Sequence, residues 1–201
     1  MWSIIQAAGW PIWPLILASV IALALIFERL WSLRSALVAP PGLVDHVLVE
    51  FRQTGATPEL LAKTAAQGPL GRILAAGLAN VKAPRPVMKE AIEEVGRVVT
   101  HDLERFLTTL GTIAAMSPLL GLLGTVIGMI EIFGSQTSAG SNPIQLAHGI
   151  SIALYNTAMG IIVAVPALIF YRHFRSKIDG LVVEMEQQAI KLVDFAHGER
   201  K

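Results

Sequence analysis

The distribution of positive charge constrains this chain more than any other feature. All 16 Lys and Arg residues lie in two blocks, Arg29 to Arg105 and Arg172 to Lys201. The two regions without them, residues 1–28 and 106–171, contain three long apolar runs. Because Lys and Arg near the ends of a membrane span resist translocation, this pattern predicts three membrane crossings with both basic blocks in the cytoplasm.

Each apolar run is long enough to cross the hydrocarbon core of a bilayer, which takes about 20 residues. The runs are Trp10 to Phe27, Phe106 to Ile130 and Ile144 to Tyr171. Arg29 follows the first run at once, which places the amino terminus outside and the carboxyl terminus inside. The predicted fold class is an all-α integral membrane protein with three transmembrane helices, two of them long and extending into a cytoplasmic helical bundle.

These features divide the chain into seven predicted segments. They are a periplasmic amino-terminal segment (1–9), transmembrane helix 1 (10–28), a cytoplasmic helical domain (29–105), transmembrane helix 2 (106–133), a periplasmic hairpin (134–143), transmembrane helix 3 (144–171) and a cytoplasmic carboxyl-terminal helix (172–201). Breaks at Gly55 to Pro58 and at Pro84 to Pro86 separate three helical stretches in the cytoplasmic domain. No breaker follows the last stretch, which predicts one continuous helix from cytoplasm into membrane.

Two parts of the basic blocks show apolar residues at helical spacing. The stretch before the second span has Ile92, Val95, Val99, Leu103 and Phe106 on one face, and the tail has Ile178, Leu181, Met185, Ala189, Leu192 and Ala196. Each pattern predicts an amphipathic helix that needs a partner surface. The loop and the tail are therefore expected to form the cytoplasmic bundle together.

The composition excludes several classes of function. There are no cysteines and only five scattered His residues, so disulfides and metal-ligand clusters are not expected. A Gly-rich phosphate loop of the Walker type is also missing from the sequence. We therefore expect no metal, cofactor or catalytic residue, no enzymatic activity and no nucleic-acid partner. Arg172, Arg175 and Lys177 are expected to anchor the third helix at lipid headgroups.

Small residues form one face on each of the second and third runs. These faces comprise Gly121, Gly124, Thr125 and Gly128 on the second run, and Ala153, Thr157, Gly160, Ala164 and Ala167 on the third. Small faces let membrane helices approach closely, so close helix packing is one interpretation. The other is a channel wall around a further helix, in which Thr125 and Thr157 hydrogen-bond a buried ionisable group near mid-membrane.

The segments that carry these faces resemble a known family. Ser117 to Met129 reads SPLLGLLGTVIGM, and Gly149 to Gly160 reads GISIALYNTAMG, with AVPAL following from Ala164. These segments resemble the second-span and third-span signatures of the MotA/TolQ/ExbB proton-channel family. The length and the three-span layout are more similar to the ExbB or TolQ type than to the flagellar stator, which has four spans.

The resemblance implies an energy-coupling subunit of the bacterial inner membrane. ExbB-like subunits form a homopentamer around single-span helices of two ExbD-like partners, and a membrane Asp of the partner carries protons to drive a TonB-like or Tol-type system. On this resemblance Thr125 and Thr157 match the family's two pore threonines. The family's helix-packing positions match Pro118, Gly121, Gly124, Gly128 and Gly160, and Ala164 is assigned to the same set.

One position departs from the family pattern. Many ExbB proteins have a Glu in the third span, five residues before the threonine, where this chain has Ile152. An intramembrane acid is a functional candidate by default. The departure predicts that this chain needs no acid of its own at mid-membrane and relies on its threonines and the partner's acid.

Weaker candidates and alternative functions remain open. Asn156 faces either a neighbouring subunit or the pore, while Glu131 and His148 are either interfacial residues or points of proton entry. A role in energising TonB-dependent transport is expected. A TolQ-like subunit of the Tol-Pal system and a non-conducting membrane scaffold are the alternatives, and the identity of the partner would discriminate between them.

Overall fold

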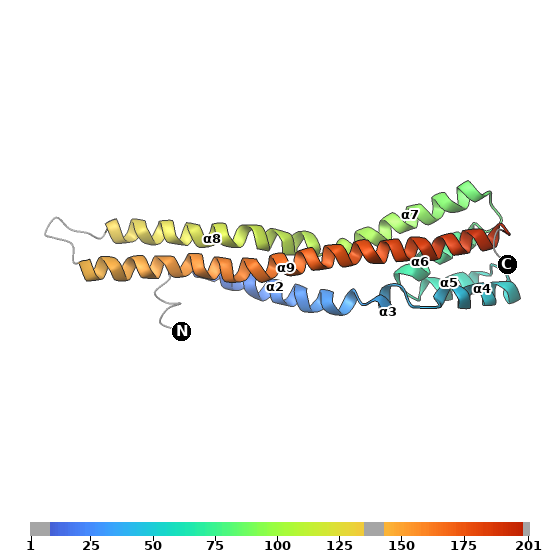
Figure 1. Cartoon of the computed structure of the whole chain (residues 1–201), viewed down its shortest axis with the longest axis horizontal. Helices are drawn as coiled ribbons and strands as arrows, with labels where there is room; N and C mark the ends of the chain where they lie inside the picture. Colours follow the sequence, from blue (N-terminus) through green and yellow to red (C-terminus); the bar gives the residue numbers. More distant parts are fainter. Residues whose placement is uncertain (1–8, 135–142, 199–201) are drawn as a thin grey trace. The chain divides into compact units, whose positions relative to one another are not determined.

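All regular elements that the structure describes are α-helices. The computed structural model describes residues 9–134 and 143–198 (Figure 1). The predicted amino-terminal segment (1–9) and hairpin (134–143) lie outside the described residues, apart from Gly9, Gly134 and Pro143. Contacts divide the chain into two units, Met1–Glu28 with Phe106–His173, and Arg29–Arg105 with Phe174–Lys201. We call them the apolar unit and the polar unit.

Three helical stretches are long and apolar enough to cross a membrane. They are α2 (Ile12–Ser32), the stretch Arg85–Gly134, and Leu146–Ala196. The second comprises α7 (Arg85–Glu104) and α8 (Leu107–Gly134), and the third lies within α9 (Pro143–Ala196). The predicted all-helical class with three long apolar helices is thereby confirmed. With 54 residues, α9 is about 80 Å long, far more than a bilayer core requires.

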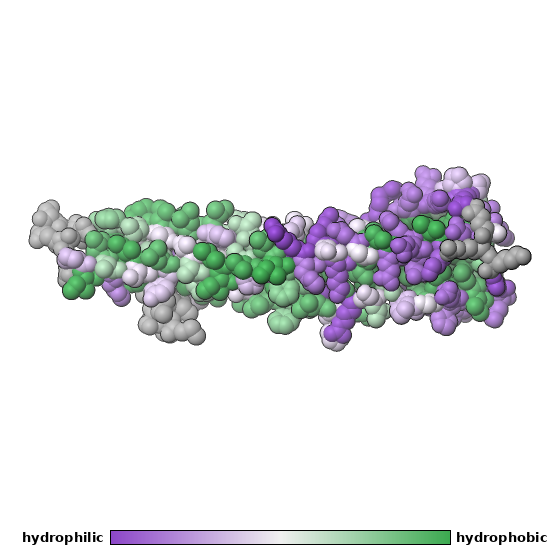
Figure 2. Space-filling model, viewed as in Figure 1, coloured by the Kyte–Doolittle hydropathy of each residue, from purple (hydrophilic) through white to green (hydrophobic). Residues whose placement is uncertain are grey.

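The apolar unit has hydrophobic side chains on its outside. Figure 2 shows a mainly hydrophobic surface over α8 and the first part of α9. Large apolar side chains that are more than half exposed occur on all three helices: Phe27, Leu119, Ile130, Ile162 and Ile169. Apolar surface of this extent indicates contact with lipid or with other subunits.

The polar unit is built from short helices and the end of α9. Its remaining helices are α3 (Ser35–Val38), α4 (Leu43–Thr54), α5 (Pro58–Ala65) and α6 (Pro69–Ala79). The sequence predicts one stretch between Pro58 and Pro84, but the structure breaks it at Gly68. Gly68 has a φ of 99°, and a Cβ there would lie 2.7 Å from the Leu37 carbonyl oxygen. Pro69 then opens α6, since proline fits the first turn of a helix.

The two predicted amphipathic faces form the core of the polar unit. Along α9, Ile178, Leu181, Met185, Ala189 and Leu192 are each 3% exposed or less. Along α7, Ile92, Val99 and Leu103 are buried and Val95 is partly exposed, as is Phe106 beyond the end of the helix. A Cβ on Gly77 of α6 would meet both Leu192 and Ile92, so the three helices converge there. The amphipathic faces are confirmed, and their cytoplasmic location remains a prediction.

Three ion pairs surround this core on α7. They join Arg72 to Asp102 at 2.7 Å, Arg85 to Asp194 at 3.0 Å and Arg175 to Glu104 at 2.6 Å between charged nitrogen and oxygen. All of these side chains keep some solvent exposure, and such pairs typically contribute about 0–1 kcal/mol each. They orient α7 against α6 and α9 more than they stabilise it.

The predicted continuous helix is interrupted by two turn residues at the end of α7. That helix ends at Glu104, and α8 begins at Leu107. The buried Arg29 donates from Nη1 to the Leu103 carbonyl oxygen at 3.0 Å. In a continuous helix that carbonyl would accept the Leu107 N–H, so the guanidinium competes with helix propagation. A cation at a helix carboxyl end is also favoured by the helix dipole. The sequence lacks a Gly or Pro signal because the break comes from this tertiary contact.

Candidate functional site

The small faces of α8 and α9 pack directly against each other in the apolar unit. Figure 1 shows the two helices side by side. A Cβ on Gly160 would meet the Ser117 backbone, one on Gly121 would meet Thr157, and one on Gly128 would meet Ala153. As the residue numbers of these contacts increase along α8, those of their partners on α9 decrease, so the two helices run antiparallel. We call this contact the small-residue seam.

Glycine is required where the backbones of the seam meet. A Cβ on Gly160 would lie 2.5 Å from the Ser117 carbonyl oxygen, and one on Gly121 would lie 2.7 Å from that of Asn156. Both obstacles are backbone atoms, which a rotamer change cannot move away. A Cβ on Gly124 would lie 2.7 Å from the Cβ of Asn156. Any side chain at these positions would force α8 and α9 apart.

Other predicted packing residues also lie along the seam. Ala164 is buried at 6% exposure, and Pro118 is partly buried inside α8. Proline removes one backbone donor, so it loosens the helical ladder at the crossing with Gly160. Ser117 is 1% exposed and donates its hydroxyl to the Ile113 carbonyl oxygen at 2.7 Å. In the sequence Ser117 stands within the second-span signature, and no periodic pattern marks it as a buried polar residue.

The hydroxyls of Thr125 and Thr157 contact each other across the seam. Both are also 3.2 Å from the Gly121 carbonyl oxygen, and that of Thr125 is 3.3 Å from the Ala153 carbonyl oxygen. Both side chains are partly buried within the single subunit. The structure therefore brings together two hydroxyls that are 32 residues apart in sequence.

This cluster can both donate and accept hydrogen bonds. Each hydroxyl has one proton to donate and two lone pairs. Two protons are thus shared between the two hydroxyls and the Gly121 and Ala153 carbonyl oxygens, while lone pairs remain for an outside donor. By rotating, a hydroxyl can exchange a carbonyl acceptor for a carboxylate. The pair therefore suits an acid that is alternately protonated and ionised.

The structure places Asn156 between α8 and α9 of one subunit. Its side chain is 1% exposed and lies against Gly124. That Asn156 faces a neighbouring subunit or a pore stays a prediction, since the structure describes one chain, in which the side chain lies between two helices. Gly124 lies about one helical turn after Gly121 and has no side chain, so it leaves space for the Asn156 side chain.

A cavity of about 310 Å³ adjoins Asn156 in the apolar unit. Its walls come from residues 9–11, from α8 between Gly124 and Ile132, and from α9 between Gly149 and Asn156. Glu131 and Ile152 both line it, on opposite helices. Glu131 is exposed, as is His148, which does not line the cavity. No periodicity brings these three segments together, so sequence reasoning did not find the cavity.

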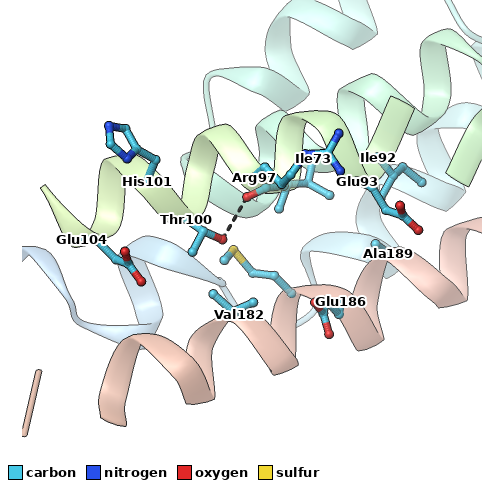
Figure 3. A pocket seen from close by; sticks show the side chains of 12 residues that line it. Ile73, Ile92, Glu93, Arg97, Thr100, His101, Glu104, Val182, Glu186 and Ala189 are labelled. Atoms are coloured by element: carbon cyan, nitrogen blue, oxygen red, sulfur yellow. Dashed lines mark hydrogen bonds between the residues drawn. The ribbon is translucent and has the colours of Figure 1, made fainter. Parts of the chain in front are cut away.

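A separate pocket of about 400 Å³ lies between α7 and α9 in the polar unit. Figure 3 shows Thr100 on α7 across from Val182 on α9. The Thr100 hydroxyl donates to the Gly96 carbonyl oxygen of its own helix at 2.9 Å, and Glu104 is paired with Arg175. Thr100 and Glu104 are thus engaged within the unit, and we take the threonine pair of the apolar unit as the candidate site.

Fold and site together define a helical membrane protein with a hydroxyl pair inside a small-residue seam. Residues 65–187, which include that seam, match the MotA/TolQ/ExbB proton channel family. The chain belongs to this family, as its resemblance predicts, and the family comprises channel and transport subunits.

Three relatives illustrate the range of the family. The biopolymer transport protein exbB1 of Vibrio cholerae is 34% identical over 171 residues, covering 81% of this chain and 74% of that protein. The putative biopolymer transport protein ExbB-like 3 of Synechocystis is 36% identical over 168 residues, covering 81% and 79%. The Tol-Pal system protein TolQ of Pseudomonas aeruginosa is 28% identical over 204 residues, covering 90% and 86%.

Proposed function

We propose that this chain is the stator-like subunit of a proton-driven motor in the bacterial inner membrane. In this proposal five copies enclose the single membrane helices of two ExbD-like partners, with amino termini in the periplasm and carboxyl termini in the cytoplasm. The Thr125–Thr157 hydroxyl pair is the observation that carries the proposal. Its two hydroxyls can hydrogen-bond an ionisable group on a partner helix.

The cost of a charge inside an apolar wall supports this mechanism. The seam between Ser117 and Thr125, and its counterpart on α9, contains no Lys, Arg, Asp or Glu. A charged carboxylate of a partner helix is expensive to hold in such surroundings. Protonation from the periplasmic side removes that charge and lets the acid change its position. Release on the cytoplasmic side restores the charge and completes a step.

The threonine pair would hold the acid in both of its states. Toward a carboxylate, Thr125 and Thr157 each donate a hydroxyl proton, and toward the protonated acid, a lone pair accepts its O–H. No bond other than O–H forms or breaks. The membrane potential supplies about 2.3 kcal/mol per charge per 100 mV, in addition to the pH gradient.

An ExbB-like role in energising TonB-dependent outer-membrane transport is our first assignment within the family. The names of the relatives from Vibrio cholerae and Synechocystis favour it, since both are biopolymer transport proteins of the ExbB type. The relative named TolQ favours a Tol-Pal role as the second candidate. The two roles differ in partner, so co-purification with an ExbD-like or a TolR-like subunit separates them.

The native mass of the detergent-extracted complex tests the assembly. The chain is expressed with and without an ExbD-like partner, and the complex is weighed by native mass spectrometry. Five copies of this chain with two of the partner are expected. A homo-oligomer that never captures a single-span partner would refute the motor and favour a scaffold.

Proton flux through the complex tests the hydroxyl pair. Replacing both threonines with valine (T125V/T157V) keeps their shape and removes both hydroxyls. Each hydrogen bond to a charged group contributes about 1.5–3 kcal/mol, so flux should fall about tenfold or more with assembly intact. T108V/T109V, on the same helix outside the seam, is the matched control. Full flux in the T125V/T157V complex would exclude this role for the threonines.

A further inference from the structure

The cavity beside the small-residue seam is lined by an acidic side chain and by the residues that precede the two threonines. Glu131 lies in the last turn of α8, and the cavity lining reaches Gly124 and Asn156. These two residues directly precede Thr125 and Thr157 in the chain. Seven residues of α8 separate Glu131 from Gly124, a rise of about 10 Å. The cavity thus extends from the last turn of α8 to the neighbours of the threonine pair.

Size and polar groups suit this cavity to water. A volume of about 310 Å³ exceeds the roughly 30 Å³ that one water occupies in the liquid, so several waters fit. Buried waters need polar partners, and wholly apolar cavities stay dry. Here Glu131 and Asn156 both line the cavity and supply polar side chains. The amide can both donate and accept, so it can orient water in either direction.

Glu131 is the one ionisable side chain among the described residues that line the cavity. It is exposed, so protons can reach it from the end of α8. The facing wall contributes Ile152 and Ala153, which carry no charge. Proton uptake at this cavity can therefore pass through one carboxylate.

We infer that the cavity is a hydrated vestibule through which protons enter the threonine site, with Glu131 as the entry group. The inference rests on the proposed function and adds the route by which protons reach the threonine pair. A proton from outside binds a carboxylate oxygen of Glu131 and passes to cavity water, which restores the carboxylate. Water held by the Asn156 amide delivers the proton to the partner's acid at the threonine pair.

Cysteine labelling tests the hydration without any measurement of transport. The chain has no native cysteine, so single cysteines report one position each. Ile127 lines the cavity, whereas Ile130 lies on the same helix outside it, on the apolar outer surface that would face lipid in the membrane. A thiol reacts as its thiolate, which needs water. In the complex with its partner, I127C should react with a membrane-impermeant methanethiosulfonate about tenfold faster than I130C or more.

Proton flux in liposomes tests the role of Glu131. E131Q should lower flux about tenfold or more, as loss of a proton-transfer group does. E28Q removes an exposed carboxylate of the same unit outside the cavity and should conduct like wild type. E131Q/I152E moves the carboxylate to the facing wall of the same cavity and should recover a large part of the flux.

The outcomes separate this inference from the proposed function. Equal, slow labelling of I127C and I130C in a conducting complex would overturn the hydrated vestibule. Wild-type flux in E131Q would overturn the entry role of Glu131. A wild-type complex that carries no protons would instead refute the proposed function, whether or not I127C reacts.

Discussion

Helix α9 buries two different kinds of surface along its length. In the apolar unit its buried positions are Ala153, Asn156, Gly160, Val163, Ala164 and Ala167, and in the polar unit they are Phe174, Ile178, Leu181, Met185, Ala189, Leu192 and Val193. Small side chains thus give way mostly to large ones within a single helix. In water, burial of large apolar groups drives packing, whereas in lipid that transfer gains nothing and close contact must replace it.

The two units should tolerate different kinds of substitution. The polar unit depends on the volume of its apolar side chains, so loss of volume should damage it. The apolar unit depends on the absence of side chains at Gly121, Gly124 and Gly160, so added volume should damage it. The two units should therefore respond in opposite ways to substitutions that change size.

The largest expected loss of stability is in the polar unit. Ile178 is fully buried, and Ile178→Ala should lower the free energy of unfolding by about 2–5 kcal/mol. Ile190→Ala, on the exposed side of the same helix, should change it by no more than about 0.5 kcal/mol. Hydrogen exchange of the α9 amides measures both. Equal effects of the two substitutions would contradict the buried face.

The second prediction concerns the boundary between the units. Arg29→Met keeps an apolar stem but removes the guanidinium from the Leu103 carbonyl, at a cost of about 1.5–3 kcal/mol. The freed carbonyl should accept the Leu107 N–H and join α7 to α8. Slower hydrogen exchange at Leu107 checks this, with the exposed Arg34→Met as control. An unchanged exchange rate would show that Arg29 does not cause the break.

The third prediction uses two glycines of the same helix. Gly160→Ala places a methyl group against the Ser117 backbone and should cost about 1–3 kcal/mol. At Gly180 nothing lies within 4 Å of an added Cβ, so Gly180→Ala should stabilise by about 0.5–1 kcal/mol. Thermal unfolding in detergent compares them. A stabilising Gly160→Ala would disprove the backbone contact in the seam.

The smallest expected effect concerns the absent third-span acid. If the chain needs no carboxylate at mid-membrane, Ile152→Glu should leave proton-driven activity unchanged or lower it. With Glu131 already lining the same cavity, a second carboxylate at position 152 adds no function that the chain lacks. Proton flux of the complex measures the effect, with Ile152→Gln as an uncharged control. Higher flux in the Glu variant alone would show that the missing acid limits this protein.

Some features of the fold follow from local pattern. The three apolar runs, the amphipathic faces of α7 and α9 and the small faces of α8 and α9 are periodic, and periodicity reports which side of a helix is buried. The break at Gly68 was also readable, because Gly followed by Pro marks a turn, although the sequence analysis missed it. The assignment to a proton channel family came from two signatures within those helices.

Other features required segments that are distant in the chain. The contact of Arg29 with Leu103, the position of Asn156 behind Gly124 and the cavity lined by Glu131 all join different helices. No periodic pattern in the sequence predicts these contacts, because each depends on the register between two helices. Helical phase places a residue on a face but does not say which residue lies opposite.

The sequence by itself determined the class of this protein, since charge and hydropathy decide which segments can leave water. It also determined that α8 and α9 would meet closely, because small residues at helical spacing allow little else in lipid. Only the tertiary structure decided that Thr125 would meet Thr157 and that Glu131 would share a cavity with Asn156. Those pairings depend on the register between α8 and α9, and backbone contacts at Gly121 and Gly160 set it.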